Sequence, residues 1–268
     1  MRAIERAGEN GRRADELAAT LREAGALALK AFRGTIKSWT KGHSSPVSEI
    51  DIAVNDLLHA RLDRSDIGWL SEESKDDALR MQGRRVWIVD PIDGTRAYLA
   101  GLPEWSISVA LVEDGRPVVA GVYVPAADEM FIATADGGTT LNGAPVRASS
   151  GRELAGARVA GPKGTLDRFA ALAPGIVAMP KVPSLALRLA RVAQGRLDAS
   201  FASLHAHDWD LAAADLLVHE AGGALTDVAG LRLTYNRPEL VHGALIAAGS
   251  ARHAAILGLV REKWANPS

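Results

Sequence analysis

The sequence contains no cysteine. This absence excludes disulfide bonds, thiolate metal sites and a cysteine nucleophile, so any metal ion has to bind through oxygen or imidazole ligands. Long apolar runs are missing as well. The run at residues 107–112 is far shorter than the roughly 18 residues of a membrane span, and the N-terminal residues lack the apolar stretch of a signal peptide. We therefore expect a cytoplasmic protein with no membrane partner.

An excess of charge of either sign is also absent. The chain has 31 basic and 32 acidic residues, a net charge of −1, and no long basic run. Such a balance provides no electrostatic signature for nucleic acid, so no nucleic-acid partner is expected. With 268 residues, of which 47% are hydrophobic, the chain is long enough for one large domain or two subdomains that share a core.

The pattern of apolar residues changes along the chain. A 3.6-residue period predicts a helix over 12–32 and a second helix from about Ser48. Short β-branched and aromatic segments separated by turn residues then predict a largely antiparallel sheet. Beyond residue 150, helical and strand patterns alternate, which is typical of an α/β fold. We predict an N-terminal α+β subdomain at residues 1–140 and a C-terminal α/β subdomain at 141–268, with a cleft between them.

The stretch VWIVDPIDGTRAYL, residues 86–99, places two carboxylates directly after a run of four apolar residues. One interpretation is a strand that ends in a turn, with Thr95 capping a short helix. The other is that Pro91 and Gly94 hold Asp90 and Asp93 facing one small volume, where a cation has to balance their charge. Hard oxygen ligands without sulfur favour Mg²⁺, an ion that typically acts on phosphates.

The spacing of this motif excludes one phosphatase mechanism. Enzymes that attack phosphate with an aspartate need that nucleophile two residues before the second acid, and here the position is Pro91. Because proline cannot attack phosphorus, the sequence favours water as the nucleophile, activated between metal ions.

Further acidic residues lie elsewhere in the chain, and each also has an ordinary structural explanation. Glu72 and Glu73 follow an expected strand, where a solvated acidic loop is equally consistent. Asp208 and Asp210 open a long apolar helix, where aspartate is a favoured cap. Asp51 completes a capping-box pattern with the preceding serine.

Taken together, these segments resemble a known family. The motifs at 45–51, 71–74, 87–95 and 209–223, in this order, are similar to those of the inositol monophosphatase superfamily, which comprises Mg²⁺-dependent, lithium-sensitive phosphomonoesterases. The resemblance covers residues 12–263. It implies a layered αβαβα sandwich that combines α+β and α/β parts, with the active site between two subdomains. It also implies two to three Mg²⁺ ions, a small phosphomonoester as substrate, and a possible homodimer.

The resemblance assigns roles to individual positions. Asp51 and Thr95 would orient and deprotonate the attacking water, with Glu72 contributing to catalysis, and Glu73 would lie outside the set of ligands. Asp93, Gly94, Thr95 and Asp210 would also bind the substrate. The implied metal ligands are Glu72, Asp90, the backbone carbonyl of Ile92, Asp93 and Asp210.

The substrate is less closely specified. The segment at 71–111, including Glu104, looks like the 3'(2'),5'-bisphosphate nucleotidase branch, which hydrolyses adenosine 3',5'-bisphosphate to AMP and phosphate. Ser203 stands where inositol-specific members carry a glutamate. Tyr235 and Asn236 are candidates for a purine contact or for a structural loop. The alternatives are an inositol-1-phosphate or histidinol-phosphate phosphatase and, from another class, a non-catalytic partner of the transcription or ribosome machinery.

Overall fold

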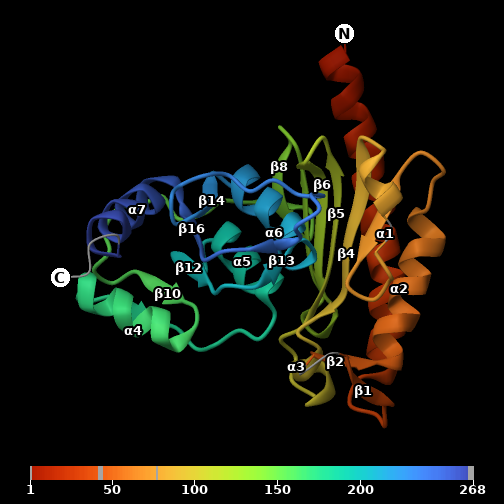
Figure 1. Ribbon diagram of the computed structural model, residues 1–268, viewed down its shortest axis with the longest axis horizontal. Coiled ribbons are helices and arrows are strands. Elements are labelled where there is room, and N and C mark those ends of the chain that lie inside the picture. The colour runs from red at the N-terminus through yellow and green to blue at the C-terminus, as the bar shows by residue number, and fades with distance from the viewer. Residues whose placement is uncertain (1, 42–44, 77, 265–268) are drawn as a thin grey trace.

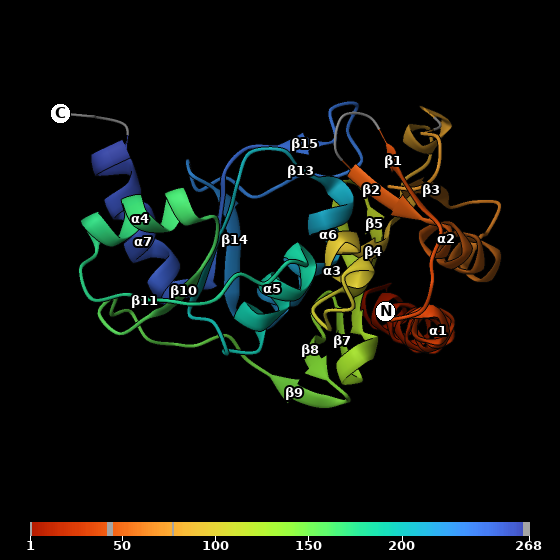
Figure 2. The same cartoon turned by 90° about the horizontal axis from the view of Figure 1, so that it is seen from below.

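Helices and sheets alternate in five layers in the computed structural model, which describes residues 2–41, 45–76 and 78–264 (Figure 1). Two helices form one outer layer, and a sheet, a helix pair and a second sheet follow in order (Figures 1 and 2). A last helix pair covers the far side, so the predicted αβαβα sandwich is confirmed. The three helix layers are α1 (Arg2–Ala31) with α2 (Glu49–Leu62), α5 (Leu185–Ala193) with α6 (Asp208–Glu220), and α4 (Lys163–Leu172) with α7 (Ser250–Trp264).

The first sheet has seven strands in the order β3-β4-β5-β6-β7-β8-β9, and all neighbours are antiparallel except β3 and β4. The predicted antiparallel sheet is therefore present. Asn142 and Gly143, both at positive φ, form the tight turn between β8 and β9. The sheet continues to Val146, so the boundary predicted at 140/141 crosses this hairpin. The strands are β3 (Gly68–Ser71), β4 (Arg85–Asp93), β5 (Ser106–Glu113), β6 (Arg116–Val124), β7 (Glu129–Thr134), β8 (Gly138–Leu141) and β9 (Ala144–Val146).

The second sheet is mixed, with the strand order β11-β10-β12-β16-β14. Strand β10 runs parallel to β11 and β12, whereas β16 runs antiparallel to β12 and β14. Strands β10 and β14 were not predicted from the sequence. The strands are β10 (Arg158–Ala160), β11 (Val177–Ala178), β12 (Ala199–Ala202), β14 (Gly223–Asp227) and β16 (Leu245–Gly249).

Shorter elements complete the described part of the chain. Two small ribbons pair β1 (Ser38–Lys41) with β2 (Ser45–Ser48) and β13 (Ala206–His207) with β15 (Val241–His242). Helix α3 (Thr95–Leu99) follows β4 and packs against β2 at the lower end of the first sheet in Figure 1. Two 3-10 turns are η1 (Ala78–Met81) and η2 (Pro125–Ala127).

Strand β4 contributes to two apolar layers because successive side chains of a strand point to opposite faces. Trp87 and Val89 pack in the layer under α1 and α2. Val86 and Ile88 pack in the layer that α5 and α6 cover on the other face. A third apolar layer lies between the second sheet and α4 and α7. The even-numbered face of β4 is therefore the one directed toward the centre of the sandwich.

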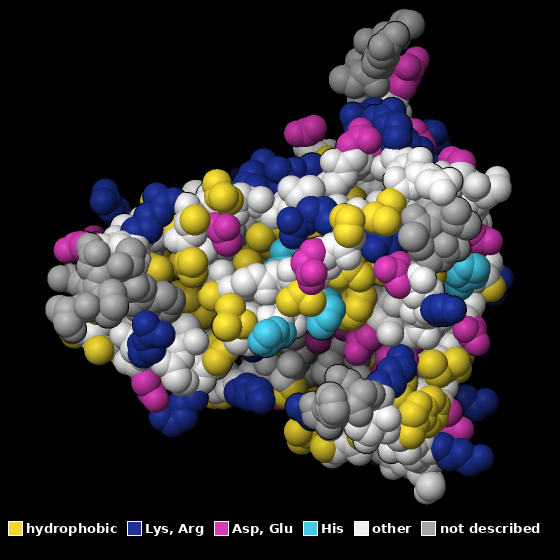
Figure 3. Space-filling model, viewed as in Figure 1, with side chains coloured by type: hydrophobic (Ala, Val, Ile, Leu, Met, Phe, Trp, Pro, Cys, Tyr) yellow, Lys and Arg dark blue, Asp and Glu magenta, His cyan; other side chains and the backbone are white. Residues whose placement is uncertain are grey.

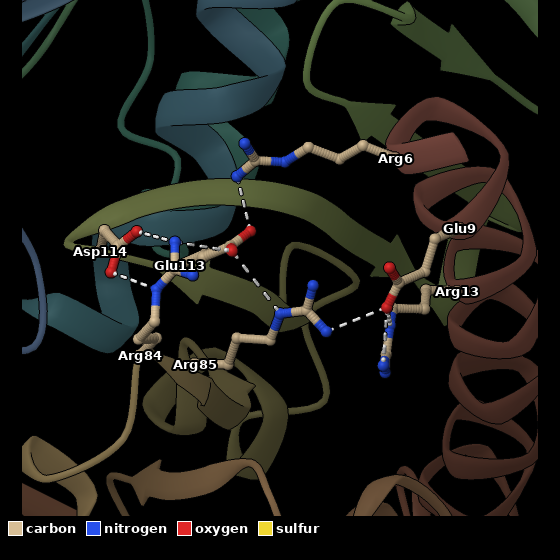
Figure 4. A network of polar contacts seen from close by, with 7 residues as sticks. All are labelled: Arg6, Glu9, Arg13, Arg84, Arg85, Glu113 and Asp114. Carbon is tan, nitrogen blue, oxygen red and sulfur yellow. Dashed lines mark hydrogen bonds and ion pairs between the residues drawn. The ribbon is translucent and has the colours of Figure 1, made fainter. Parts of the chain in front are cut away.

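A network of arginine and carboxylate side chains fixes α1 to one end of strands β4 and β5 in the first sheet (Figure 4). Glu113, at the end of β5, is buried and accepts a hydrogen bond of 2.6 Å from Arg6 of α1. Glu9 of α1 pairs with Arg85 at the start of β4. Arg13, Arg84 and Asp114 complete the network. It lies at the end of β4 and β5 opposite to the acidic motif.

On the face shown in Figure 3, basic side chains lie among acidic and apolar ones over both halves of the molecule. No helix in the described parts of the chain combines the length and the apolar composition that a membrane span requires.

Candidate metal centre and phosphate pocket

The two aspartates of the DPID motif face the same side of the sheet because β4 contains a bulge. Asp90 pairs with Ser108 and Asp93 with Ser106, so three residue steps on β4 oppose two on β5. In a regular strand, residues three apart point to opposite faces, and one extra residue restores the match. Pro91 has no N–H to contribute to the ladder and is tolerated at such a bulge. Strand β4 therefore continues past Pro91 to Asp93. The expected turn lies at Gly94, which caps the following short helix in place of Thr95.

The predicted metal ligands converge on one pocket of about 310 Å³. Carboxylate oxygens of Asp90, Asp93 and Asp210 lie within 4.8 Å of one another. Glu72, directly after β3, and Ile92 line the same pocket. Strands β3 and β4 and helix α6 therefore bring together all five ligands that the sequence resemblance implied.

The electrostatics of this pocket call for a cation. Burial raises the pKa of Asp90 and of Asp210 well above the usual range, and the neighbouring carboxylates add to both shifts. Burial, followed by repulsion from Asp93, raises the pKa of Glu72 to about 7. The Oδ1 atom of Asp90 is buried and has no hydrogen-bond partner. Divalent cations with a preference for oxygen ligands fit this set, because they neutralise several carboxylates at once.

Asp93 is held by the start of α5. Ser184 Oγ donates to Asp93 Oδ2 at 2.6 Å, and the backbone N–H groups of Leu185 and Ala186 donate to the same carboxylate at 3.2 and 2.6 Å. These bonds oppose the effect of burial, which raises the pKa of Asp93. Ser184 was not identified from the sequence, because it lies more than 90 residues along the chain from its partner.

Asp210 combines a capping role with its place in the pocket. It is the third residue of α6, and its Oδ2 accepts a 2.6 Å hydrogen bond from the backbone N–H of His207, which precedes the helix. Asp208 instead points away from the pocket, where its two carboxylate oxygens bind Asn236 N and His242 Nε2, each at 2.7 Å. The capping explanation is therefore correct for Asp210, but it does not exclude a ligand role.

Asp51 and Thr95 are in contact, as the resemblance implied. Thr95 Oγ1 lies 3.1 Å from Asp51 Oδ1 and 3.0 Å from the carbonyl oxygen of Ile92. The other carboxylate oxygen of Asp51 accepts from the N–H and hydroxyl of Ser48 and completes a capping box at the start of α2. Burial raises the pKa of Asp51, whereas these hydrogen bonds lower it. One oxygen thus fixes the helix, and the other faces the threonine.

Gly94 shapes the link between β4 and α3. Its φ of 95° lies in the left-handed region, and a Cβ atom there would approach Glu104 O and Ser184 N to 3.3 Å. Only glycine adopts this conformation without strain. Gly94 and Thr95 consequently line the pocket next to Asp93.

Arg96 and Lys181, which line the pocket, and Lys41, which lies beside it, were not identified from the sequence. Lys41 Nζ pairs with the Glu73 carboxylate and donates to the carbonyl of Glu72 at 3.3 Å. Burial lowers the pKa of Lys41, and the nearby carboxylate of Glu72 opposes that shift. Glu73 does not line the pocket, in keeping with its predicted place outside the ligand set. Lys181 lines the pocket from the C-terminal half.

A second pocket, of about 670 Å³, adjoins the first through Lys181 and contains Ser203 and Arg188 in its lining. Glu104, Tyr235 and Asn236 line neither pocket. The hydroxyl of Tyr235 is buried and lies 3.0 Å from Asp215, and Asn236 N binds Asp208. These contacts favour the structural-loop alternative over a purine contact.

Comparison with known proteins agrees with this geometry. The model of the inositol monophosphatase family matches residues 12–265. Over 223 residues the chain is 34% identical to the Nus factor SuhB of Escherichia coli strain K12, covering 78% of this chain and 82% of that protein. It is 33% identical over 227 residues to an inositol monophosphatase of Dictyostelium discoideum, with the same two coverages. These names support the predicted family but not specifically the bisphosphate nucleotidase branch.

Solved structures extend the likeness to the fold. The extragenic suppressor protein suhB of Bartonella henselae superposes with a TM-score of 0.81 at 27% identity, covering 92% of this chain and 98% of that one. An IMPase of Thermotoga maritima has the same score and identity, with coverages of 94% and 97%. The chain therefore belongs to the inositol monophosphatase family and is a phosphoric monoester hydrolase.

Proposed function

We propose that this protein is a Mg²⁺-dependent phosphatase that cleaves a small phosphate monoester by attack of water. The observation that carries the proposal is the convergence of four buried or half-buried carboxylates on one pocket, with a buried oxygen of Asp90 left without a partner. Two to three Mg²⁺ ions would be held by Glu72, Asp90, the carbonyl of Ile92, Asp93 and Asp210.

Bound Mg²⁺ would supply Lewis acidity toward the phosphate and would favour ionisation of a bound water. The protein side chains position the water and accept its proton. Thr95 Oγ1 donates to Asp51 Oδ1. The lone pairs of the threonine oxygen are then free to accept a hydrogen bond from a water in the pocket. Asp51 is then one hydrogen bond away from the proton that the water releases.

The relatives suggest the class of substrate. Proteins named inositol monophosphatase and inositol-1-monophosphatase are among the matches at 33% and 34% identity. We therefore infer that the phosphate ester of a polyol, of the inositol 1-phosphate type, is the substrate class supported best.

A second candidate is adenosine 3',5'-bisphosphate. Ser203 is exposed and lines the second pocket at the position where the sequence resemblance would place a glutamate in inositol-specific members. A hydroxyl binds the ring hydroxyls of inositol less strongly than a carboxylate does, by roughly 1.5–3 kcal/mol for a charged hydrogen bond. A serine in place of that glutamate favours a substrate whose alcohol part is something other than an uncharged polyol.

Phosphate release from a panel of substrates tests the proposal. Inositol 1-phosphate, histidinol phosphate and adenosine 3',5'-bisphosphate are compared at equal Mg²⁺, with and without excess EDTA. We expect Mg²⁺-dependent release, and we expect Ser203→Glu to raise kcat/KM for inositol 1-phosphate relative to the nucleotide. A protein that hydrolyses none of these esters would contradict the proposal.

The names of the SuhB relatives keep a non-catalytic role in transcription as an alternative. Such a role does not require the carboxylate cluster, so a variant that lacks Asp90 distinguishes the two: it abolishes phosphate release and leaves binding of a protein partner intact. The expected homodimer belongs to the same proposal, and light scattering at several protein concentrations tests it.

A further inference from the structure

Asn236 lies in the chain segment between β14 and β16, residues 228–244, which reaches from the second sheet to the first (Figure 1). The neighbouring Tyr235 N donates to the carbonyl of Gly115, between β5 and β6, at 3.1 Å. The φ of Asn236, 58°, lies in the left-handed region, where asparagine is one of the more common residues after glycine. In this conformation its side chain and its backbone N–H bind two different parts of the protein.

The side chain of Asn236 is bound at both ends to Arg80 of η1. Arg80 Nη1 donates to Asn236 Oδ1, and Asn236 Nδ2 donates to the carbonyl of Arg80 at 3.4 Å. The Arg80 side chain is almost fully buried and also binds both carboxylate oxygens of Asp76, at 2.7 and 3.2 Å. The backbone of Arg80 packs against β3, since a Cβ at Gly68 would approach the Cα of Arg80 to 3.0 Å. Arg80 therefore holds the loop of which Glu72 is the first residue and Asp76 the fifth.

The backbone N–H of Asn236 is bound to the other side of the metal pocket. It donates to Asp208 Oδ2 at 2.7 Å, and Asp208 is the first residue of α6. The other carboxylate oxygen of Asp208 lies 2.7 Å from His242 Nε2, and the N–H of Asp208 donates to the carbonyl of Leu240 at 3.0 Å. Asp208 is fully buried, so water does not compete for these bonds. Asp210, the proposed metal ligand from this helix, lies two residues further along.

Asn236 thus joins two segments that are far apart in the sequence. One carries Glu72 and the other carries Asp210, and both of these carboxylates line the metal pocket. Like charges in one pocket repel each other, so contact within the pocket does not hold the two segments together when no cation is bound. A hydrogen-bonded bridge outside the pocket supplies that attraction and leaves the space for ion and substrate open.

We propose that Asn236 is a positioning residue, which sets the distance between Glu72 and Asp210 before a metal ion binds. It acts through Arg80 on one side and Asp208 on the other, and it does not line the metal pocket itself. Ligands that are already held at the right separation lose less conformational freedom on binding, so the bridge raises the affinity for Mg²⁺. This inference rests on the proposed function and deepens it.

Calorimetric titration of the metal-free protein with Mg²⁺ tests the inference without turnover. Asn236→Gly is the informative variant, because glycine keeps the left-handed backbone and the N–H bond to Asp208 and removes the side-chain bonds to Arg80. We expect this variant to bind Mg²⁺ about tenfold more weakly than wild type, at the lower end of the effect of residues that orient metal ligands. Phosphate release should need more Mg²⁺ to the same degree, whereas kcat at saturating Mg²⁺ should stay within about threefold of wild type.

Asn142→Gly is the matched control. Asn142 also has a positive φ, of 49°, and its side chain binds Met130 N and the carbonyl of Asp128, each at 2.8 Å. It lies between β8 and β9, at the edge of the first sheet opposite to β3. Glycine removes two side-chain bonds at either position, so both variants should lower the midpoint of urea unfolding in EDTA. Only Asn236→Gly should lower the affinity for Mg²⁺, which a merely structural role of Asn236 would not do.

Arg80→Lys tests the bridge from its other side. Lysine keeps the charge but cannot bind Asp76 with two nitrogens and Asn236 with a third. We expect Mg²⁺ binding about threefold weaker or more, again through loss of ligand positioning. Combined with Asn236→Gly, it should weaken binding by no more than about twofold beyond Asn236→Gly alone, because the effects of residues in one network do not add.

Thermal unfolding verifies that the variants fold, and if Asn236→Gly does not fold, Arg80→Lys still provides the test. Mg²⁺ affinities within about twofold of wild type in the folded variants of Asn236 and Arg80, or an equal loss in Asn142→Gly, overturn the inference and leave the phosphatase function standing. Absence of both Mg²⁺ binding and phosphate release in the wild type overturns the proposed function, and this inference with it.

Discussion

Ser184 and Asp93 join the two halves of the protein through a hydrogen bond of 2.6 Å. The same hydroxyl of Ser184 accepts from Leu187 N at 3.0 Å and caps helix α5. Ser106 Oγ, on β5, lies 2.9 Å from it. One side chain therefore fixes the start of a helix in the C-terminal half and the orientation of a proposed metal ligand in the N-terminal half.

We expect Ser184→Ala to weaken the apparent affinity for Mg²⁺ by about tenfold, since partners that orient a ligand typically contribute 10- to 100-fold. Loss of the helix cap should also lower the free energy of unfolding by about 1 kcal/mol. Titration of phosphate release with Mg²⁺ and urea unfolding measure the two effects. Ser250→Ala, which loses a hydrogen bond near α7, is the control. An unchanged Mg²⁺ requirement in Ser184→Ala would argue against an orienting role.

Asp90→Asn should reduce turnover by several orders of magnitude while the fold survives, because it removes the carboxylate on which the proposed ions depend. In excess EDTA the variant should be more stable than wild type, since the change relieves repulsion among buried carboxylates. Urea unfolding in EDTA and phosphate release in Mg²⁺ test both parts. Asp114→Asn, at the far end of the sheet, should alter neither. Undiminished hydrolysis by the wild type in EDTA would end the metal hypothesis.

Thr95 and Asp51 should act as one unit on the attacking water. Because a coupled pair fails when either member is lost, the double variant Thr95→Ala with Asp51→Asn should be little slower than the slower single variant. Thr95→Ser, which keeps the hydroxyl, should retain most of the activity. The comparison requires kcat for the wild type, the two single variants and the double variant. Losses that add fully in log kcat would show that the two residues act independently.

The metal-free protein should lose stability as the pH rises. Burial raises the pKa of Glu72 from 4.5 to about 7, so the stability that depends on its protonation is fully present below pH 4.5 and is lost as the pH passes through about 7. Bound Mg²⁺ favours the ionised forms and should offset the loss more strongly at higher pH.

Urea unfolding at pH 5, 6, 7 and 8, in EDTA and in Mg²⁺, measures this dependence. Glu72→Gln should flatten the decline between pH 5 and 8 in EDTA, and Mg²⁺ should stabilise it less than it stabilises the wild type. A free energy of unfolding that rises with pH in EDTA, equally in wild type and variant, would contradict the assignment.

The sequence was sufficient to predict the five proposed ligands because each lies in a motif whose order and spacing are specific. Local patterns also predicted most helices and the antiparallel sheet. The side chains that position or surround the ligands could not be predicted from the sequence. Ser184, Lys181 and Arg188 approach the site only when α5 packs against the end of β4, and no short-range pattern encodes that contact.

Two local predictions failed for identifiable reasons. Pro91 and Gly94 resemble a strand terminator, yet the strand absorbs the proline as a bulge and continues to Asp93. Strand β14 begins with Gly223, directly after a helix-ending glycine, and its short sequence lacks a clear alternation of apolar and polar residues. In both cases pairing with neighbouring strands, which is a tertiary interaction, outweighed the local preference.

Because of the bulge at Pro91, the acidic pair depends on the face of β4 to which each side chain points as well as on residue identity. Without the bulge, two aspartates three residues apart on a regular strand would point to opposite faces of the sheet, and one of the two carboxylates would turn toward the apolar layer of Trp105 and Ile107. Every acid of the motif would still be present in such a chain, but the cluster would be dismantled. A relative that retains both aspartates three residues apart but has no bulge between them therefore lacks this centre, however well the rest of its sequence aligns.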